Sequence, residues 1–136
     1  MLRTVVAVAF ALAACSKGGS DVPPGADYRR VALEFAQALA ARDYAKAHGK
    51  TSEAFRRRMT VDQMRAAFEA TVPEDFGPIG PVEVGQTLED WPGKQPGDLG
   101  RAYVSIGGET YSEAVTVVVA MEGGEARIRD AEFGRP

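Results

Sequence analysis

The first half of the chain repeats apolar residues at the spacing of α-helices. Over residues 26–41, one apolar face recurs at three- and four-residue intervals, which predicts an amphipathic helix. Asp43 as a cap and Gly49 as a stop predict a short second helix. Ser52 can cap a further turn that carries Phe55. The apolar positions of the first helix are Tyr28, Val31, Ala32, Phe35, Ala38 and Leu39.

A capping box marks the start of one more helix. Thr60 offers a hydroxyl at the cap, and Gln63 offers an amide three residues later. Val61, Met64 and Phe68 then form an inward face. Pro73 ends the helix because proline cannot continue the backbone hydrogen bonding.

Beyond Pro73 the apolar period changes from helical to alternating, which predicts strands over residues 82–89, 101–106, 114–121 and 126–130. The two glycines of residues 122–125 predict a tight hairpin, because its turn needs positive φ at both central positions. The third strand has the most apolar face and is expected to be central. The inward faces of the first and third strands are predicted to be Val82, Val84, Gln86 and Leu88, and Val115, Val117, Val119 and Met121.

Helices followed by strands predict an α+β fold. We expect the N-terminal helices to pack on the concave face of a curved antiparallel sheet of about four strands, giving a cone-like shape. The predicted core includes Phe35, Phe55, Phe68, Val117 and Val119.

The N-terminus has the pattern of an export signal. Arg3 precedes an apolar run over residues 5–14, which is too short to span a bilayer. The run ends in Leu12, Ala13, Ala14 and Cys15, which resembles the lipobox of bacterial lipoproteins. We therefore expect a signal peptide over residues 1–14, a lipidated Cys15 with a tether to residue 25, and one domain over residues 26–136. An ordinary signal peptide with a stray cysteine is the alternative.

Localisation follows from this segment. An exported chain with a single cysteine has no internal disulfide, and lipid on that sulfur anchors it to a membrane. An aspartate directly after the cysteine would resemble an inner-membrane sorting signal, but this chain has Ser16 there. In a Gram-negative host we expect the outer membrane, with the domain facing the periplasm.

The charge of the chain indicates which classes of binding partner are expected. The net charge is -3, and no basic excess indicates a nucleic-acid partner. Residues 21–72 hold nine basic and seven acidic side chains, whereas residues 73–136 hold five basic and twelve acidic ones. The second half is therefore acidic, either as a solvated face or as a surface that orients a partner.

The segment FAQALAARDYAKAHGKTSEAFRRRMTVDQMRAAFEA (residues 35–70) resembles the opening of a nuclear-transport-factor-two-like domain. This cone-shaped superfamily also includes ketosteroid isomerase, and the resemblance extends over most of residues 26–133. It implies a pocket between helices and sheet. Some members are enzymes, many bind ligands or partners, and many dimerise, so the fold alone does not assign chemistry.

Candidate catalytic residues are few. His48 is the only histidine and could act as a general base, or it could serve packing. Asp43 could be a carboxylate of the cone or a helix cap. Glu89 and Asp90 are adjacent but point to opposite faces of a strand. Residues 56–58 are three arginines that could meet anionic lipid or simply face solvent. No metal-ligand cluster or phosphate loop occurs, so no metal or cofactor is predicted.

These observations leave three function hypotheses. The leading one is a non-enzymatic, lipid-anchored envelope protein that binds a partner protein or a small apolar ligand; a homodimer is a further option. The second is a small enzyme of the isomerase, cyclase or dehydratase type, using His48 or Asp43 in the cone. The third is an immunity or inhibitor protein whose acidic sheet face docks a basic toxin.

Overall fold

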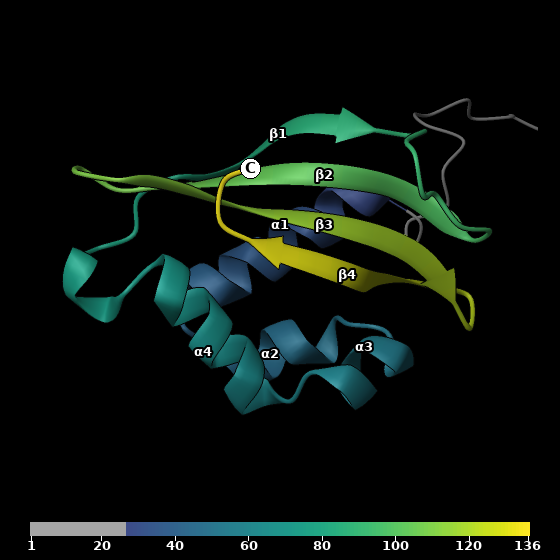
Figure 1. Cartoon of the computed structure of the whole chain (residues 1–136), viewed down its shortest axis with the longest axis horizontal. Coiled ribbons are helices and arrows are strands. Elements are labelled where there is room, and N and C mark those ends of the chain that lie inside the picture. The colour runs from purple at the N-terminus through teal and green to yellow at the C-terminus, as the bar shows by residue number, and fades with distance from the viewer. Residues whose placement is uncertain (1–26) are drawn as a thin grey trace, which may run out of the picture.

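A computed structural model of the chain describes residues 27–136. The predicted signal peptide, Cys15 and the tether lie outside the described residues. Within them, a layer of helices covers one face of a curved antiparallel sheet (Figure 1). The predicted α+β class, with N-terminal helices packed on a curved sheet of four strands, is confirmed.

Four helices and one 3-10 turn precede the sheet. Each helix begins at a side chain whose oxygen accepts a hydrogen bond from the backbone N–H three residues on, and these caps are Asp27, Asp43, Ser52 and Thr60. The capping box of Thr60 and Gln63 is complete in both directions. The bounds are α1 Tyr28–Ala40, α2 Tyr44–Gly49, α3 Glu53–Arg58, α4 Val61–Thr71 and the 3-10 turn η2 Glu74–Phe76.

The sheet is an antiparallel meander, with its strands paired in chain order. The middle strands are the longest, and α1 lies across the sheet face behind them in Figure 1. Isolated pairing of Thr51 with Ile128 joins the helical layer to the last strand. The bounds are β1 Val82–Leu88, β2 Asp98–Gly107, β3 Ser112–Glu122 and β4 Glu125–Phe133.

The predicted inward face of β1 is wrong beyond Val84. Val84 pairs with Val104, but the next paired residue is Thr87, opposite Ala102, so β1 carries one extra residue. Such a β-bulge reverses the facing of every later side chain in the strand. Thr87 therefore points inward, and Leu88 is 38% exposed.

The third strand follows its prediction up to Val119. Val115, Val117 and Val119 are fully buried, but Met121 is 38% exposed and not inward as expected. The pairing shifts on both sides of Val119, toward β2 and toward β4. The extra residues at these shifts are Leu99 of β2 and Arg129 of β4, so the bulges bend the two neighbouring strands. Met121 is exposed as the second-last residue of β3.

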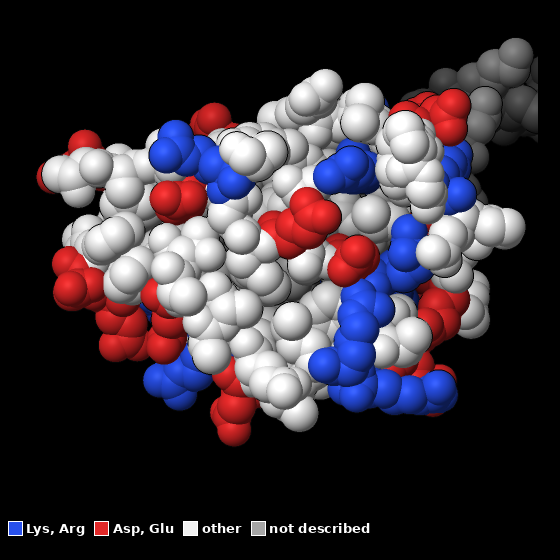
Figure 2. Space-filling model, in the orientation of Figure 1, with Lys and Arg blue, Asp and Glu red and all other residues white. Residues whose placement is uncertain are grey.

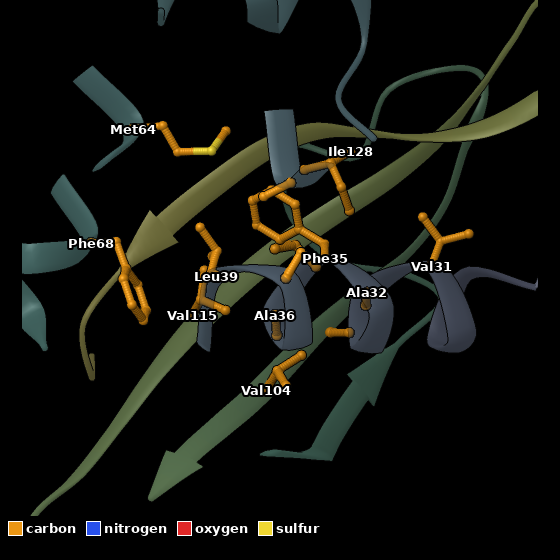
Figure 3. Close-up of a cluster of buried hydrophobic side chains, with 14 of the residues drawn as sticks. Val31, Ala32, Phe35, Ala36, Leu39, Met64, Phe68, Val104, Val115 and Ile128 are labelled. Atoms are coloured by element: carbon orange, nitrogen blue, oxygen red, sulfur yellow. The ribbon is translucent and has the colours of Figure 1, made fainter. Parts of the chain in front are cut away.

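Aromatic and aliphatic side chains fill the space between helices and sheet. The five predicted core residues, Phe35, Phe55, Phe68, Val117 and Val119, are all at most 1% exposed. Figure 3 shows how the α1 side chains reach toward those of β2, β3 and β4, with residues of α4 closing one side. The core therefore forms by the meeting of one helix face with one sheet face.

Gly100 is a position where packing demands glycine. A β-carbon there would lie 2.4 Å from the ring of Tyr28, at the start of α1. Gly100→Ala should lower the free energy of unfolding by about 1–3 kcal/mol, because the buried ring must move. Thermal or denaturant unfolding measures the loss. In the double variant with Tyr28→Ala, the total loss of unfolding free energy should be smaller than the sum of the two single losses. A total equal to that sum would contradict the steric explanation.

Candidate functional site

The interior of the cone is packed rather than hollow. The family resemblance implies a pocket between helices and sheet, but Phe35, Phe55, Phe68, Leu39 and Met64 occupy that space with at most 1% exposure each. Hollows among the described residues lie instead on the outer face of the sheet, along the surface of the helices, and at the rim where α1 meets β4. The space for a ligand is therefore on the surface.

His48 is held by a backbone carbonyl. Its Nε2 lies 2.8 Å from the carbonyl oxygen of Met59, and because a carbonyl can only accept, Nε2 carries the hydrogen. The ring is half-buried and joins α2 to the residue before the cap of α4. This contact occupies one ring nitrogen in a structural role.

Asp43 caps α2. Its Oδ1 accepts a hydrogen bond of 3.1 Å from the backbone N–H of Lys46, and the residue is exposed. It borders an open hollow on the helix surface together with Glu34 and Lys50, which form an ion pair of 2.9 Å. Among the described contacts, no hydrogen bond joins Asp43 to His48. The two candidate catalytic residues therefore do not form a pair.

The charged motifs also have local partners. Glu89 accepts from the hydroxyl of Tyr28 at 3.4 Å, which ties the turn after β1 to α1. Arg57 pairs with Glu53 within α3, at 2.5 Å. Arg58 reaches Asp130 of β4 at 3.0 Å and lies over the ring of Phe55. The arginine run thus fastens α3 to the sheet in addition to facing solvent.

A trough runs along the outer face of the sheet, opposite the helices. Its floor is made by Thr116 and Val118 of the central strand β3. Hollows of about 270 Å³ and 170 Å³ lie next to each other and share Thr116 and Arg101. Figure 2 views this side of the molecule and shows uncharged atoms with charges of both signs around them. We call this feature the outer trough; its walls are Arg101, Tyr103, Leu88, Asp130 and Glu132, with Trp91 at one end.

The strand register explains the trough. Arg101, Val118 and Asp130 form one cross-strand row, and Tyr103, Thr116 and Glu132 form the next. Small side chains in the middle of each row lie between long side chains on the flanking strands. The result is a groove with a basic residue on the β2 wall and carboxylates on the β4 wall.

A buried ion pair supports one end of the trough. Arg129 donates from Nε and Nη2 to the two carboxylate oxygens of Asp98, at 2.6 and 2.7 Å. Burial raises the pKa of Asp98, but the hydrogen bonds from Arg129 and from the Gln95 backbone outweigh it, so the pKa lies below its ordinary value. This bidentate pair fixes the start of β2 against β4.

The ion pair across the trough is looser. Arg101 Nη2 lies 3.7 Å from Glu132 Oε2, over the small residues of β3, and the Glu132 side chain is 71% exposed. Exposed pairs at this distance contribute little free energy. Both groups are therefore available to charges on a binding partner.

Sequence reasoning missed this site, although part of its signal was present. The alternation of β2 places Arg101 and Tyr103 opposite the core face, and that of β3 does the same for Thr116 and Val118. Their alignment with Asp130 and Glu132 depends on a bulge in β4, where the register shifts between Val118 and Val119. Periodicity alone does not locate such a bulge.

Comparison with protein-family models, curated proteins and solved structures finds no match for this chain. Among the described residues, no helix has the length and apolar character needed to cross a bilayer. No group of three or more metal-ligating side chains occurs in residues 27–136 either.

Proposed function

We propose that this chain is a lipid-anchored protein of the bacterial envelope that binds a partner protein through its outer trough. The observation that carries the proposal is the trough itself, a groove of small residues with opposite charges on its two walls. The lipobox-like sequence at Cys15 supports the anchor.

The form of the trough favours a protein partner over a small apolar ligand. Sites for small molecules are concave, mostly apolar and bury most of the ligand. The outer trough is open. Its larger hollow is lined mainly by polar and charged groups such as Arg101 and Glu132, and only its smaller hollow, at Leu88 and Tyr103, is mainly apolar. Such surfaces with balanced charge are typical of transient protein contacts, where electrostatics set orientation and specificity.

The other hypotheses have less support. For an enzyme, His48 and Asp43 have structural partners and do not meet. For an inhibitor of a basic toxin, a uniformly acidic sheet face is expected, but Arg101 and Arg129 stand among the carboxylates of the trough. A homodimer through the same face remains an outcome that the experiment below distinguishes.

Site-specific photo-crosslinking in the producing cell tests the proposal. A photoreactive amino acid is placed at Thr116, on the trough floor, and in a second variant at Ala45, exposed on α2. We expect a discrete adduct with another protein at position 116 and none at 45. Adducts at both positions, or at neither, contradict the proposed face. An adduct of two copies of this chain at 116 alone identifies a homodimer instead.

A charge variant provides an independent check. Arg101→Glu reverses the basic wall and leaves the core unchanged, so it should abolish the adduct at position 116 while the unfolding temperature changes little. Lys46→Glu, an equal charge reversal on the helix surface, should leave the adduct intact. Equal effects of the two variants would indicate that only net charge matters.

A further inference from the structure

Two exposed apolar side chains lie at one end of the domain. Three large apolar residues of the described chain stand out by exposure: Phe76 at 44%, and Leu88 and Met121 at 38% each. Leu88 ends β1, and Met121 precedes the hairpin between β3 and β4. Figure 1 shows that β1 and β3 both end where α1 begins, whereas Phe76 belongs to η2 near the opposite end of the sheet.

Specific contacts join this end to the start of α1. Tyr28 and Arg29 both reach Glu89, at 3.4 and 3.9 Å. The backbone N–H of Met121 donates to the carbonyl of Gly97 at 2.9 Å. Residues 89–97 therefore form a loop between Leu88 and Met121, next to the first described residues. We call Leu88, this loop and Met121 the tether end.

The loop has side chains suited to a lipid–water boundary. Trp91 is half-buried, and Lys94 Nζ lies 5.7 Å from the centre of its ring. Tryptophan concentrates at the headgroup level of membranes because its ring is apolar with one polar group. Lysine beside it keeps its ammonium in the aqueous layer.

Charge limits how deep such a contact can go. Glu89 and Asp90 are exposed in the same loop, and carboxylates do not enter hydrocarbon. Arg29 lies near Glu89 and Arg127 against Glu125, and the positive charge of Lys94 is offset by the two carboxylates of its own loop. The tether end thus has no cationic surplus, so its attraction to a bilayer must be apolar and shallow.

We propose that the tether end rests on the membrane surface at headgroup level, with Leu88, Trp91 and Met121 in contact with lipid. This inference rests on the proposed lipid anchor at Cys15. Eleven residues separate Cys15 from Asp27, which span at most about 36–40 Å when fully extended. The anchor therefore keeps this end within that distance of the lipid and raises its effective concentration at the surface, so a weak apolar contact is sufficient.

The orientation has a functional consequence. With the tether end on the membrane, the strands point away from the bilayer. The end of the outer trough at Leu88 and Trp91 then meets the lipid, and the rest of the trough, around Thr116 and Glu132, stays open to the aqueous compartment. The far end, with Phe76 packed against Tyr111 at 5.3 Å between ring centres, is directed away from the lipid.

Intrinsic fluorescence tests the orientation, because Trp91 is the only tryptophan of the chain. The full-length lipidated protein is reconstituted into phosphatidylcholine vesicles that contain a brominated or nitroxide-labelled lipid as quencher. The control carries Trp91→Phe together with Phe76→Trp, which moves the single tryptophan to the opposite end. We expect a blue shift and several-fold stronger quenching for Trp91 than for the relocated tryptophan. Raising the salt concentration should change neither the blue shift nor the quenching of Trp91, because the contact is apolar.

The outcomes separate this inference from the anchor. A protein that carries lipid and floats with the vesicles, yet shows equal quenching at both positions, overturns the orientation and leaves the anchor intact. A chain whose mass shows no lipid, and which does not float, overturns the anchor and this inference with it. A lipidated double variant, Leu88→Glu/Met121→Glu, tests whether these side chains make the contact. We expect it to bind vesicles as the wild type does but to lose the quenching of Trp91.

Discussion

Replacing Phe55 by alanine should lower the free energy of unfolding by about 3–4 kcal/mol. The ring is 1% exposed, although it belongs to α3, a helix of only two turns. It lies beneath the guanidinium of Arg58, which reaches across to β4. Removing the ring deletes buried apolar surface and leaves a cavity where α3 meets the sheet. Chemical denaturation, followed by circular dichroism, measures the loss.

Phe76→Ala is the matched control, since the same atoms are removed from a ring that is 44% exposed. Its only described ring partner is Tyr111, so we expect a cost of about 1 kcal/mol or less. Equal losses for the two variants would contradict the burial of Phe55 between α3 and the sheet.

Removing the charge of Asp98 should cost about 2–3 kcal/mol at neutral pH. Its side chain is fully buried, and both oxygens accept from Arg129, whose own side chain is only 25% exposed. Asp98→Asn keeps the shape but leaves the guanidinium facing an amide that repels one of its N–H groups. Because Asp98 and Arg129 join β2 to β4 across β3, the loss should appear as a lower unfolding temperature of the whole domain.

The cost should depend on pH in a defined direction. The pKa of Asp98 is lowered in the folded protein, so its contribution is complete above its ordinary unfolded pKa of about 3.9. It disappears as the pH falls through the lowered folded pKa. The difference between the wild type and Asp98→Asn should therefore be constant from pH 5 to 8 and shrink below about pH 4. Glu132→Gln, at the loose pair with Arg101, should cost no more than about 0.5 kcal/mol.

The helical half was predictable because its signals are local. Caps at Asp27, Asp43, Ser52 and Thr60 are formed within four residues of chain, and the apolar face of α1 follows from its period. The end of α4 is different. Arg42, held at φ 59°, donates from Nη1 to the carbonyl oxygen of Val72 at 2.9 Å. No local pattern indicates that a side chain thirty residues away satisfies this helix end.

The number of strands was predictable, but the face of the sheet that each side chain occupies was less so. Alternation identifies the inward residues of β2, where Ala102, Val104 and Ile106 are all buried as predicted. It fails for Leu88, because a residue inserted in β1 reverses the facing of the strand beyond Val84. It also fails for Met121, which lies at the end of β3 beside the bulges of β2 and β4. Both failures left apolar side chains exposed at the tether end.

The sequence by itself determined the α+β order of the elements and the main residues of the core. It also predicts an export signal with a lipid-acceptor cysteine. All of these depend on neighbours in the chain or on a single amphipathic period. The outer trough depends on the register of three strands, which brings Arg101 opposite Asp130 and Glu132 across small residues of β3. Only the tertiary structure decided that the space between helices and sheet is filled. The physical reason is that the fit of Phe35, Phe55 and Phe68 against the sheet determines whether an interior is filled or open.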